Sequence, residues 1–568
     1  MEKRWVIKVA DDEEVRSLQK ELKIHPVLCS LLVQRGIKTY DAAKQFFRPS
    51  LADLYDPFLM RDMEKAVVRI TEAIHNQERI LIFGDYDVDG TTAVALMYAF
   101  FHTRYRNIDF YIPDRYKEGY GISYQGIDYA KTNNCTLMIA LDCGIKAVDK
   151  AAYAKSLGID LIICDHHIPG EELPDAFAVL DPHRPDCTYP YKDLSGCGIG
   201  FKLIHAFAIH HGIPVEQIIS YLDLVVVSIA SDIVPIMGEN RILAYYGLEQ
   251  LNKNPRPGLK ALIDITGYTP PLNISNIVFG LGPRINAAGR MDDANKAVRM
   301  LIADTVSNAR DGAGELQDKN VDRKAVDKRI TANALTMLEQ DPLTSDRVST
   351  VLTSDEWHKG VIGIVASRLL DHYYRPTILL AESNGMLFGS ARSVKNFDIY
   401  EAIKACSDLL EQFGGHMYAA GLSMQKDKFE LFRDRFDAVV RERIRPEQLI
   451  PEIEIDATLQ LKDINASFFN ILRQFAPFGP HNMEPVFISE QVRNSGRSKI
   501  VGEGHLKLSV RDASRAGAEA IAFQKGHYFD AIAKGNPFDI CYTIEENTFR
   551  DMTSLQLNVR DLKVNGGG

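Results

Sequence analysis

The stretch ILIFGDYDVDG, from Ile80 to Gly90, decides the fold of this chain. Four apolar residues lead straight into a loop with carboxylates at alternate positions, Asp85, Asp87 and Asp89, and the largely apolar TTAVALMYAFFH follows. A short continuous apolar run is typical of a strand covered on both faces, and the segment after the loop has the length of a helix. The stretch therefore predicts a strand, a loop and a helix of a parallel sheet.

The same alternation continues toward the C-terminus. Short apolar runs, separated by segments of helical period, occupy residues 110–113, 137–141, 160–164 and 177–180. Strands that alternate with helices are typical of βαβ units, so an open, doubly wound α/β domain is predicted. The charge-rich residues 303–339 are interpreted as a long helix joining two lobes, although a solvated surface helix would show the same pattern.

The remaining sequence predicts two further domains. A second, smaller α/β pattern begins near Arg347, and after Pro451 short alternating runs replace helices, which is typical of a small β-barrel. At about 150 residues per domain, 568 residues suggest three or four domains. The expected parts are an N-terminal helical cap (1–59), a catalytic domain (60–302), a linker helix (303–345), a smaller α/β domain (346–450) and a barrel (451–568).

Composition narrows the class of protein. Apolar residues make up 46% and charged residues 25%, which excludes disordered and fibrous classes. The net charge of −10 argues against coating nucleic acid by bulk charge but permits a local basic groove. Because neither a signal peptide nor a membrane span is recognisable, we expect a cytoplasmic protein without a membrane partner. The 8 cysteines show no C-x-x-C spacing, so free thiols are expected.

Acids and imidazoles recur where the predicted strands end. The set is Asp85, Asp87, Asp89, Asp142, Asp165, His166, His167 and Asp232. Ligands of open parallel sheets bind outside the carboxyl ends of the strands, so we expect these groups to converge. Oxygen-rich coordination with few nitrogens suits Mn²⁺ or Mg²⁺ better than Zn²⁺, and this many acids implies two ions about 4 Å apart.

Two alternatives explain the aspartate loop less well. An EF-hand calcium loop also begins D-x-D-x-D-G, but its twelfth position is Leu96 here instead of Glu, and an apolar strand precedes it in place of a helix. A purely structural turn would crowd three carboxylates without a cation, which is costly. The recurrence of acids at other strand ends favours the metal site.

These motifs resemble the DHH phosphoesterase family, in which GDYDVDG, LDCG, DHH and SDIVP occur in this order. Longer stretches resemble the RecJ exonucleases of that family: SGCGIGFKL (195–203), FGLGPRINAAGRMDDA (279–294), WHKGVIGIVASRL (357–369), GSARS (389–393), FGGHMYAAG (413–421) and APFGPHNMEPVF (476–487). The resemblance covers residues 60–564. It implies a parallel-sheet DHH domain, joined by a long helix to a smaller α/β DHHA1 domain, and then an OB-type barrel.

The resemblance also implies a chemistry. The implied protein is a metal-dependent exonuclease that degrades single-stranded DNA from 5′ to 3′ to mononucleotides. It would act in DNA repair and recombination and would use two Mn²⁺ or Mg²⁺ ions. Asp87 and Asp89 would bind the two ions separately, and Asp142 would bridge them. His166 and Asp232 would complete one coordination sphere. The catalytic set implied is Asp85, Asp87, Asp89, Asp142, His166, His167 and Asp232, in which Asp85 and His167 would orient ligands.

Basic and glycine-rich motifs are expected to hold the nucleic acid. Arg284 and Arg290 lie in a Gly-Pro segment where a guanidinium can grip phosphate, although structural salt bridges would also account for them. By resemblance, Arg290, Ser390 and Arg392 would hold the 5′-terminal phosphate. The full predicted phosphate-binding set is Arg115, Arg284, Arg290, Ser390, Arg392 and His416.

The predicted barrel carries a local positive charge. The segment from Arg493 to Gly517 contains six basic residues and two acidic ones. This excess of positive charge fits single-strand binding by an OB-fold, but a solvated surface would show it as well. Phe487 and Phe523 are expected to be core residues more than stacking platforms.

Other functions remain open at this point. They are a DHH phosphodiesterase of short oligonucleotides or cyclic dinucleotides, an inorganic pyrophosphatase, and a non-catalytic DNA-binding relative. The favoured interpretation is an exonuclease whose substrate is single-stranded DNA with a 5′ end. We expect it to be a monomer and to have a single-strand-binding protein or a helicase as a partner.

Overall fold

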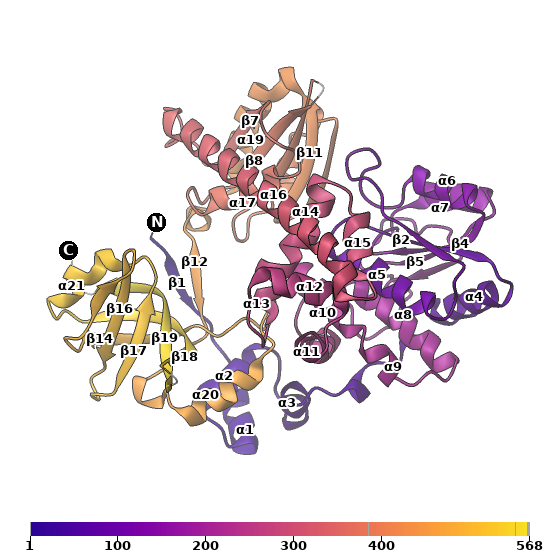
Figure 1. Ribbon diagram of the computed structural model, residues 1–568. Coiled ribbons are helices and arrows are strands. Elements are labelled where there is room, and N and C mark those ends of the chain that lie inside the picture. Colours follow the sequence, from indigo (N-terminus) through magenta and orange to yellow (C-terminus); the bar gives the residue numbers. More distant parts are fainter. Residues whose placement is uncertain (1, 384, 551, 565–568) are drawn as a thin grey trace. The chain divides into compact units, whose positions relative to one another are not determined.

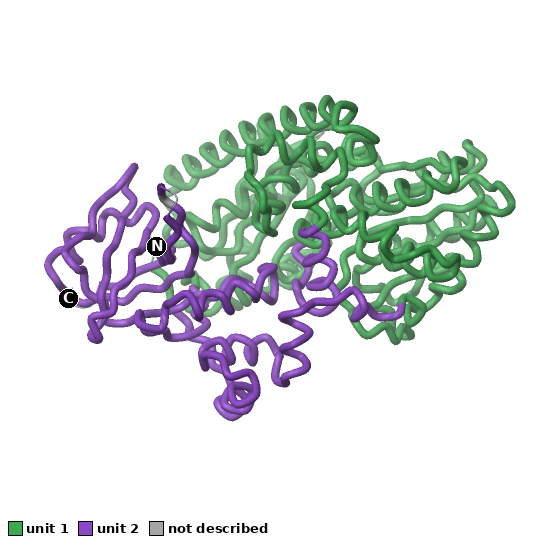
Figure 2. Tube along the Cα trace, turned by 60° about the horizontal axis from the view of Figure 1, so that its bottom comes forward, with its two compact units in different colours: residues 1–4, 57–232, 250–452 green, residues 5–56, 233–249, 453–568 purple. Residues whose placement is uncertain are grey.

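The computed structural model in Figure 1 describes residues 2–383, 385–550 and 552–564. The chain forms two compact units, each built from separate segments (Figure 2). Unit 1 comprises residues 1–4, 57–232 and 250–452, and unit 2 comprises residues 5–56, 233–249 and 453–568. None of the helices in the described ranges is long and apolar enough to cross a membrane.

The first sheet of unit 1 is parallel throughout, with strand order β3-β2-β4-β5-β6. Its strands are β2 (Arg79–Gly84), β3 (Ile108–Tyr111), β4 (Cys135–Leu141), β5 (Asp160–Cys164) and β6 (Ala178–Leu180). All five coincide with apolar runs, which confirms the predicted α/β class. Leu81 and Phe83 of β2 pack with α6 (Tyr124–Thr132) and α7 (Val148–Ser156), while the alternate residues of β2 face the opposite side, which α5 (Val88–His102) covers.

A long helix, α16 (Val306–Gln340), leads from this part of unit 1 to a second sheet (Figure 1). That sheet has the order β10-β11-β9-β8-β7, in which only β7 and β8 are parallel. Its strands are β7 (Thr350–Ser354), β8 (Thr377–Ser383), β9 (Met386–Arg392), β10 (Gln412–His416) and β11 (Ala419–Gln425). The predicted linker helix and smaller α/β domain are therefore both present.

Further helices complete unit 1. They are α4 (Met63–His75), α8 (Gly196–His210), α9 (Glu216–Ile219), α10 (Leu222–Ser231), α12 (Pro257–Thr266), α13 (Ile274–Asn276), α14 (Gly282–Met291), α15 (Asn295–Leu301), α17 (Ile362–Leu370), α18 (Ile399–Lys404) and α19 (Phe429–Arg443). Helix α11 (Gly238–Lys253) begins in unit 2 and ends in unit 1.

Unit 2 contains the barrel. Seven strands run in the order β13-β14-β18-β19-β17-β16-β15, and a further pairing of β14 with β16 closes the sheet. They are β13 (Ala457–Thr458), β14 (Phe487–Asn494), β15 (Lys499–Val501), β16 (His505–Arg511), β17 (Gly517–Ala522), β18 (Phe538–Phe549) and β19 (Met552–Val564). The short helices α20 (Ala466–Leu472) and α21 (Phe529–Ala533) accompany them.

The N-terminal residues share the barrel's core. Helices α1 (Asp12–Leu22), α2 (Pro26–Gln34) and α3 (Tyr40–Phe47) bury Leu28 and Phe46 in the same apolar cluster as Phe475 and Leu506. The sequence predicts an N-terminal helical cap over residues 1–59 but does not indicate which part of the chain its helices pack against. Hydrophobic periodicity shows only that one face of a helix is covered. A small two-stranded sheet pairs β1 (Arg4–Ile7) with β12 (Glu452–Ile455).

Candidate metal centre

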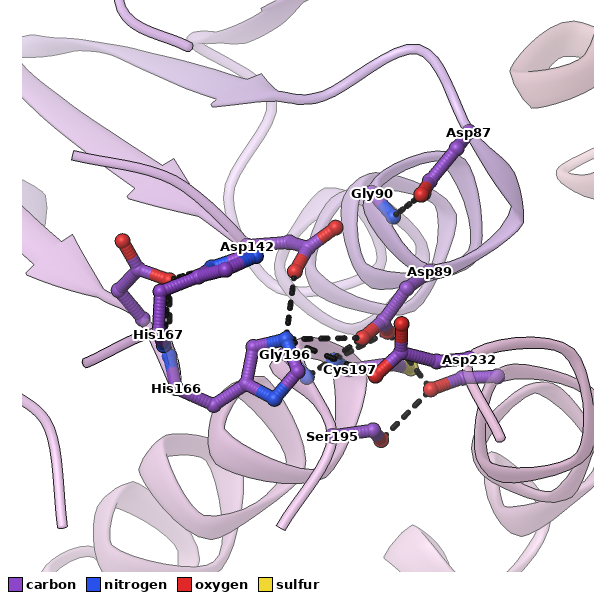
Figure 3. Close-up of polar contacts among 12 residues, drawn as sticks. Asp87, Asp89, Gly90, Asp142, His166, His167, Ser195, Gly196, Cys197 and Asp232 are labelled. Atoms are coloured by element: carbon purple, nitrogen blue, oxygen red, sulfur yellow. Dashed lines mark hydrogen bonds and ion pairs between the residues drawn. The ribbon is translucent and has the colours of Figure 1, made fainter. Parts of the chain in front are cut away.

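Acidic and imidazole side chains meet at the carboxyl edge of the first sheet (Figure 3). His166 follows β5 and lies among three carboxylates. Its Nε2 atom is 3.2 Å from Oδ1 of Asp142 and 3.6 Å from Oδ2 of Asp232. Oδ2 of Asp89 lies 3.8 Å away. Segments far apart in the sequence therefore converge on one point, as the strand-end argument predicts.

The side chains form overlapping groups in which the potential ligand atoms lie within 4.8 Å of one another. One group is Asp89, His166 and Asp232, another is Asp85, Asp87 and Asp142, and a third joins Asp142 to His166 and His167. Asp142 contributes to two of them. The arrangement offers two neighbouring places for cations with Asp142 between them.

The chemistry of these donors fits divalent cations. In the part of the chain that the structure describes, the buried atom Asp85 Oδ1 has no hydrogen-bond partner, and His166 Nε2 makes only ion-pair contacts with carboxylates. Buried polar atoms are normally paired, so an unpaired carboxylate oxygen in this cluster indicates a positively charged ligand. The set is mostly oxygen with one or two nitrogens, and suits Mn²⁺ or Mg²⁺.

Without cations the carboxylates repel one another. Burial, and then the charges of Asp89, Asp87 and Asp232, holds the pKa of Asp142 well above its ordinary value. Burial and Asp87 raise the pKa of Asp85 in the same way. For Asp232, burial and then Asp89 have the same effect on its pKa. A bound cation would offset both the cost of burying these charges and their mutual repulsion, because it neutralises the negative charge of the carboxylates.

Asp87 and Asp89 are placed by the start of α5. Asp87 caps this helix, and its Oδ1 accepts a 3.0 Å hydrogen bond from the Gly90 nitrogen. Gly90 is required at this position because a Cβ atom there would lie 2.4 Å from the carbonyl oxygen of Asp85. The glycine that ends the D-x-D-x-D-G motif thus allows the loop to fold back on itself.

The groups that hold the carboxylate of Asp89 in place were not predicted from the sequence. Its carboxylate accepts hydrogen bonds from the nitrogens of Gly196 (2.7 Å) and Cys197 (2.8 Å), at the start of α8. The hydroxyl of Ser228 donates a third, at 2.6 Å. Ser228 Oγ is also 2.6 Å from Ser195 Oγ, which accepts from the Gly198 nitrogen, so the hydroxyl protons can run in one direction toward Asp89.

Asp165 supports the DHH loop. Its Oδ1 accepts hydrogen bonds from the His166 nitrogen (2.8 Å) and from Nδ1 of His167 (2.7 Å), and its Oδ2 accepts one from the Ile145 nitrogen (2.9 Å). Burial would raise the pKa of Asp165, but the hydrogen bond and charge of His167 outweigh it and lower that pKa. Burial lowers and the pairing with Asp165 raises the pKa of His167, which lies at about 9. Both oxygens are used, so Asp165 orients the loop.

The second sheet brings the predicted phosphate-binding residues together. In its register Arg392 pairs with Ala419, which pairs with His416. Ser390 lies two residues before Arg392 on β9, and its Oγ accepts a 3.0 Å hydrogen bond from Arg392 Nη1. GSARS on β9 and GGH on β10 therefore lie at the same level of the sheet, one on each side of β11.

Arginines from the rest of unit 1 approach this group. Burial, followed by the guanidiniums of Arg115, Arg323 and Arg392, lowers the pKa of Arg290 to about 10. Arg290 Nη1 donates a 3.0 Å hydrogen bond to the carbonyl oxygen of Gly360 and so ties α14 to the segment before α17. The guanidinium of Arg115 lies 4.8 Å above the ring of Tyr86, beside the aspartate loop.

The structure places Arg284 differently from the other predicted phosphate-binding residues. It is 8% exposed, and it donates hydrogen bonds to Gln317 Oε1 (2.8 Å) and to the Gly280 carbonyl (2.7 Å). The contact with Gln317 ties α14 to α16, and the two contacts occupy Nε and Nη1, so Arg284 has a structural role while its part in phosphate binding stays a prediction.

The barrel carries a basic face with an exposed aromatic. Lys499 pairs with Lys507 across β15 and β16, and Arg493 pairs with Arg511 across β14 and β16. Phe523 is 54% exposed, contrary to the expectation of a core residue, whereas Phe487 is fully buried as expected. Ala520 and Ala522 of β17 are buried, so the alternation of the strand directs the next residue, Phe523, to the outer face.

Three family models match successive parts of the chain. They are the DHH family N-terminal domain over residues 79–229, the DHHA1 domain over residues 346–442 and the RecJ OB domain over residues 455–561. The single-stranded-DNA-specific exonuclease RecJ of Bacillus subtilis is 38% identical over 569 residues, which cover 99% of this chain and 71% of that protein. The protein of that name from Salmonella typhimurium is 33% identical, over 99% of this chain and 100% of its own.

Solved structures show the same fold. RecJ from Thermus thermophilus in complex with Mn²⁺ superposes with a TM-score of 0.84 at 27% identity, covering 99% of this chain and 80% of that one. Its complex with Mg²⁺ gives a TM-score of 0.78 at 26% identity, over 99% and 79% of the two chains. An exonuclease RecJ bound to manganese gives 0.60 at 32% identity, over 70% of this chain and 98% of that one.

Proposed function

Because the chain belongs to the RecJ family of single-stranded-DNA-specific exonucleases, we propose that it hydrolyses single-stranded DNA from the 5′ end to mononucleotides, in DNA repair and recombination. The observation that carries the proposal is the convergence of Asp142, His166 and Asp232 with the aspartate loop, in a chain that matches the family along nearly its whole length. The reaction is a phosphodiester hydrolysis with two divalent cations.

The residues of the metal centre take separate parts. Asp89 has three protein donors, so its remaining lone pairs can serve one cation, with His166 and Asp232 as further ligands. Asp87 would hold the other cation, with Asp85 beside it, and Asp142 would bridge the two. Bound Mn²⁺ or Mg²⁺ would supply charge for the phosphoryl oxygens and lower the pKa of the attacking water. Asp165 and His167 keep the loop that carries His166 in place.

The residues of the second sheet would explain why degradation proceeds from the 5′ end to the 3′ end. Arg392 and Ser390 lie on β9 and His416 lies on β10, with β11 between the two strands, and Arg290 and Arg115 add positive charge from the first part of unit 1. Guanidinium groups bind phosphate with paired hydrogen bonds. A 5′-terminal phosphate held there would set a fixed distance to the cations, so that cleavage starts at the 5′ end and releases one nucleotide at a time.

The barrel adds affinity for the strand. Lys499, Lys507, Arg493 and Arg511 supply charge for phosphates, and the exposed ring of Phe523 supplies a surface on which a base can stack. OB-folds bind single strands through this combination.

The cellular setting follows from the substrate. Single strands arise where a helicase has separated a duplex, and in cells they are covered by a single-strand-binding protein, so both are candidate partners. We place the reaction in the cytoplasm because the substrate is DNA and the similar exonucleases named above come from bacteria.

Digestion of end-labelled strands tests the proposal. With Mn²⁺ or Mg²⁺, the purified chain should release mononucleotides from single-stranded DNA and leave blunt duplex DNA and RNA largely intact. A cyclic dinucleotide and a dinucleotide serve as alternative substrates, since other DHH enzymes act on such short molecules. Faster turnover of either one would favour a phosphodiesterase of short nucleotides, and binding of DNA without turnover would favour a non-catalytic relative.

A further inference from the structure

A strained residue directly follows the candidate ligand Asp232. Ile233 has a φ angle of 62°, in the left-handed region, and 67% of its surface is exposed. A β-branched side chain is unfavourable there because its Cβ atom crowds the backbone, so the conformation persists only where neighbouring residues impose it. On the other side, Asp232 follows α10, which fixes the residues before it. The residues after Ile233 must therefore supply the constraint.

The constraint lies in unit 2, to which residues 233–249 belong (Figure 2). The buried Ile236 donates a 2.8 Å backbone hydrogen bond to the carbonyl oxygen of Pro480. Gly479 lies against the same side chain, so close that a Cβ atom there would be 2.5 Å from Ile236 Cγ1. The chain after Ile233 is therefore fixed to the motif APFGPHNMEPVF, for which the sequence predicts no separate function.

Arg241, near the start of α11, makes a second connection to the same part of the chain. Its guanidinium donates hydrogen bonds to the backbone carbonyl oxygens of Phe46 (2.9 Å), Gln474 (3.2 Å), Phe475 (2.8 Å), Ala476 (2.9 Å) and Pro477 (3.5 Å). Only 3% of Arg241 is exposed, and burial, followed by the charge of Arg35, lowers its pKa to about 9. A buried cation is costly unless its donors are satisfied, so these carbonyl groups and α11 are held in one arrangement.

These contacts form a clamp, which consists of Arg241, Ile236 and the segment 474–480. We propose that Arg241 is a positioning residue of the metal centre: through the clamp it keeps Ile233 in its left-handed conformation and so holds the Asp232 carboxylate in place as a ligand. Residues that orient a ligand contribute to metal affinity although they do not touch the ion. The inference deepens the proposed function and rests on the role of Asp232 proposed there.

A purely structural role of Arg241 makes a different prediction. If Arg241 only stabilised unit 2, its replacement would lower the melting temperature and leave metal binding by the folded protein unchanged. A positioning role predicts that one of the two cations is bound more weakly and the other is not. The reason is that Asp232 groups with Asp89 and His166, and not with the other candidate ligands.

Mn²⁺ binding to the full chain without DNA tests the role. It is measured by calorimetry and by the electron paramagnetic resonance signal of free Mn²⁺. Arg241→Lys keeps the charge but loses the planar fork, so several of the carbonyl groups lose their donor. In this variant one ion should bind roughly tenfold more weakly, while the affinity for the other stays within about threefold of wild type.

Arg35→Lys is the matched control. Arg35 is a second arginine of unit 2 that binds the same motif, with hydrogen bonds to Asn482 Oδ1 (2.7 Å) and to the carbonyl oxygens of Met483 (2.8 Å) and Leu31 (2.9 Å). These contacts tie the motif to α2, whereas those of Arg241 tie it to α11. Both ions should therefore bind Arg35→Lys as they bind the wild type, even where its melting temperature falls.

Relief of the strain at Ile233 provides a rescue. Glycine adopts the left-handed conformation without strain, so in Ile233→Gly the carboxylate of Asp232 no longer depends on the clamp. The double variant Arg241→Lys, Ile233→Gly should regain most of the Mn²⁺ affinity that Arg241→Lys loses. A general loss of stability would not be reversed in this way. If Arg241→Lys does not fold, Gly479→Ala, which presses on Ile236, should show the same selective loss and the same rescue.

The positioning role is rejected if the folded clamp variants bind both ions as the wild type does, if they lose both ions together, or if Ile233→Gly restores nothing. Asp232→Asn separates this result from a failure of the proposed function. If Asp232→Asn binds both ions like the wild type, Asp232 is not a ligand and the proposed metal centre fails. If it loses one ion and the clamp variants lose none, only the positioning role of Arg241 is wrong.

Discussion

The hydroxyl of Ser228 donates a 2.6 Å hydrogen bond to Oδ1 of Asp89 from within an apolar helix. Its neighbours on α10, Val227 and Ile229, are fully buried, and so is Ser228 itself. A lone hydroxyl in such a helix requires a partner, because an unpaired buried polar group is costly. Here the partner is a carboxylate of the candidate metal centre, so Ser228 fixes the orientation of a ligand.

Replacement of Ser228 by alanine should therefore weaken metal binding more than it weakens the fold. Loss of a group that orients a ligand typically costs about 10- to 100-fold in metal affinity. The apparent Mn²⁺ affinity, measured by calorimetry and by the Mn²⁺ dependence of turnover, should fall by about tenfold. Ser220→Ala, at an exposed position, provides the control. Equal Mn²⁺ affinity in Ser228→Ala and wild type would show that the hydroxyl has only a packing role.

Asp142→Asn should abolish turnover and stabilise the metal-free protein. Asparagine keeps the shape of the side chain but removes the charge that Asp89, Asp87 and Asp232 repel. Turnover should fall by at least about a hundredfold, because the shared ligand is lost. In EDTA near pH 8 the melting temperature should rise by about 2–4 °C for each kcal/mol of repulsion removed. A lower melting temperature together with full turnover would contradict the account.

The same repulsion fixes the direction of a pH effect. The carboxyl groups of Asp85, Asp142 and Asp232 have raised pKa values in the folded protein, so the unfolded chain ionises first as the pH rises. In EDTA the unfolding free energy should thus decrease from about pH 4 upward, through the raised pKa values, and less steeply in Asp142→Asn. Mn²⁺ should stabilise the protein most at high pH and least at low pH, since protons compete for the same oxygens. Urea unfolding at several pH values would reveal a flat or inverted profile if the carboxylates were not crowded.

His167 should contribute stability of the opposite pH dependence. Its pKa of about 9 lies above the ordinary value of 6.5, because the pairing with Asp165 outweighs burial. A raised histidine pKa stabilises the fold fully below about pH 6.5, and this contribution is lost as the pH rises through 9. The difference in unfolding free energy between wild type and His167→Gln, in EDTA, should shrink over that interval. If the difference in unfolding free energy between wild type and His167→Gln does not vary with pH, the charge on His167 does not contribute to stability through its pairing with Asp165.

Arg392→Gln should reduce the preference for a phosphorylated 5′ end. The guanidinium is half-buried beside Ser390, and it is the charge that β9 contributes to this group. The ratio of kcat/KM for 5′-phosphorylated over 5′-hydroxyl strands should fall by roughly tenfold, mainly through KM. Arg443→Gln, an exposed arginine of the same part of unit 1, serves as control. An unaltered ratio would remove Arg392 from the phosphate anchor.

Much of the fold could be predicted from local pattern. The strands of the first sheet are continuous apolar runs because helices cover both faces, and such runs are visible without knowledge of tertiary contacts. The convergence at the candidate metal centre was also predictable, since Asp142 directly follows β4, His166 lies two residues after the end of β5, and parallel strands end at one edge.

What escaped prediction depends on contacts between distant segments. Ser228 lies in an apolar run where nothing in the sequence marks its partner Asp89, 139 residues away. The backbone donors of Gly196 and Cys197 have no sequence signal at all, because every residue has the same amide. Arg284 illustrates a further difficulty, since an arginine that binds Gln317 within the fold looks in sequence like one that binds only phosphate.

Mn²⁺ binding sites located by anomalous X-ray diffraction would test the central claim most directly. The account predicts two ions about 4 Å apart, with Asp142 between them and Asp89, His166 and Asp232 around one of them. In Asp142→Asn crystals grown under the same conditions, at least one of the two peaks should be lost. A single ion in the wild type, or two ions bound away from this edge of the sheet, would contradict the account.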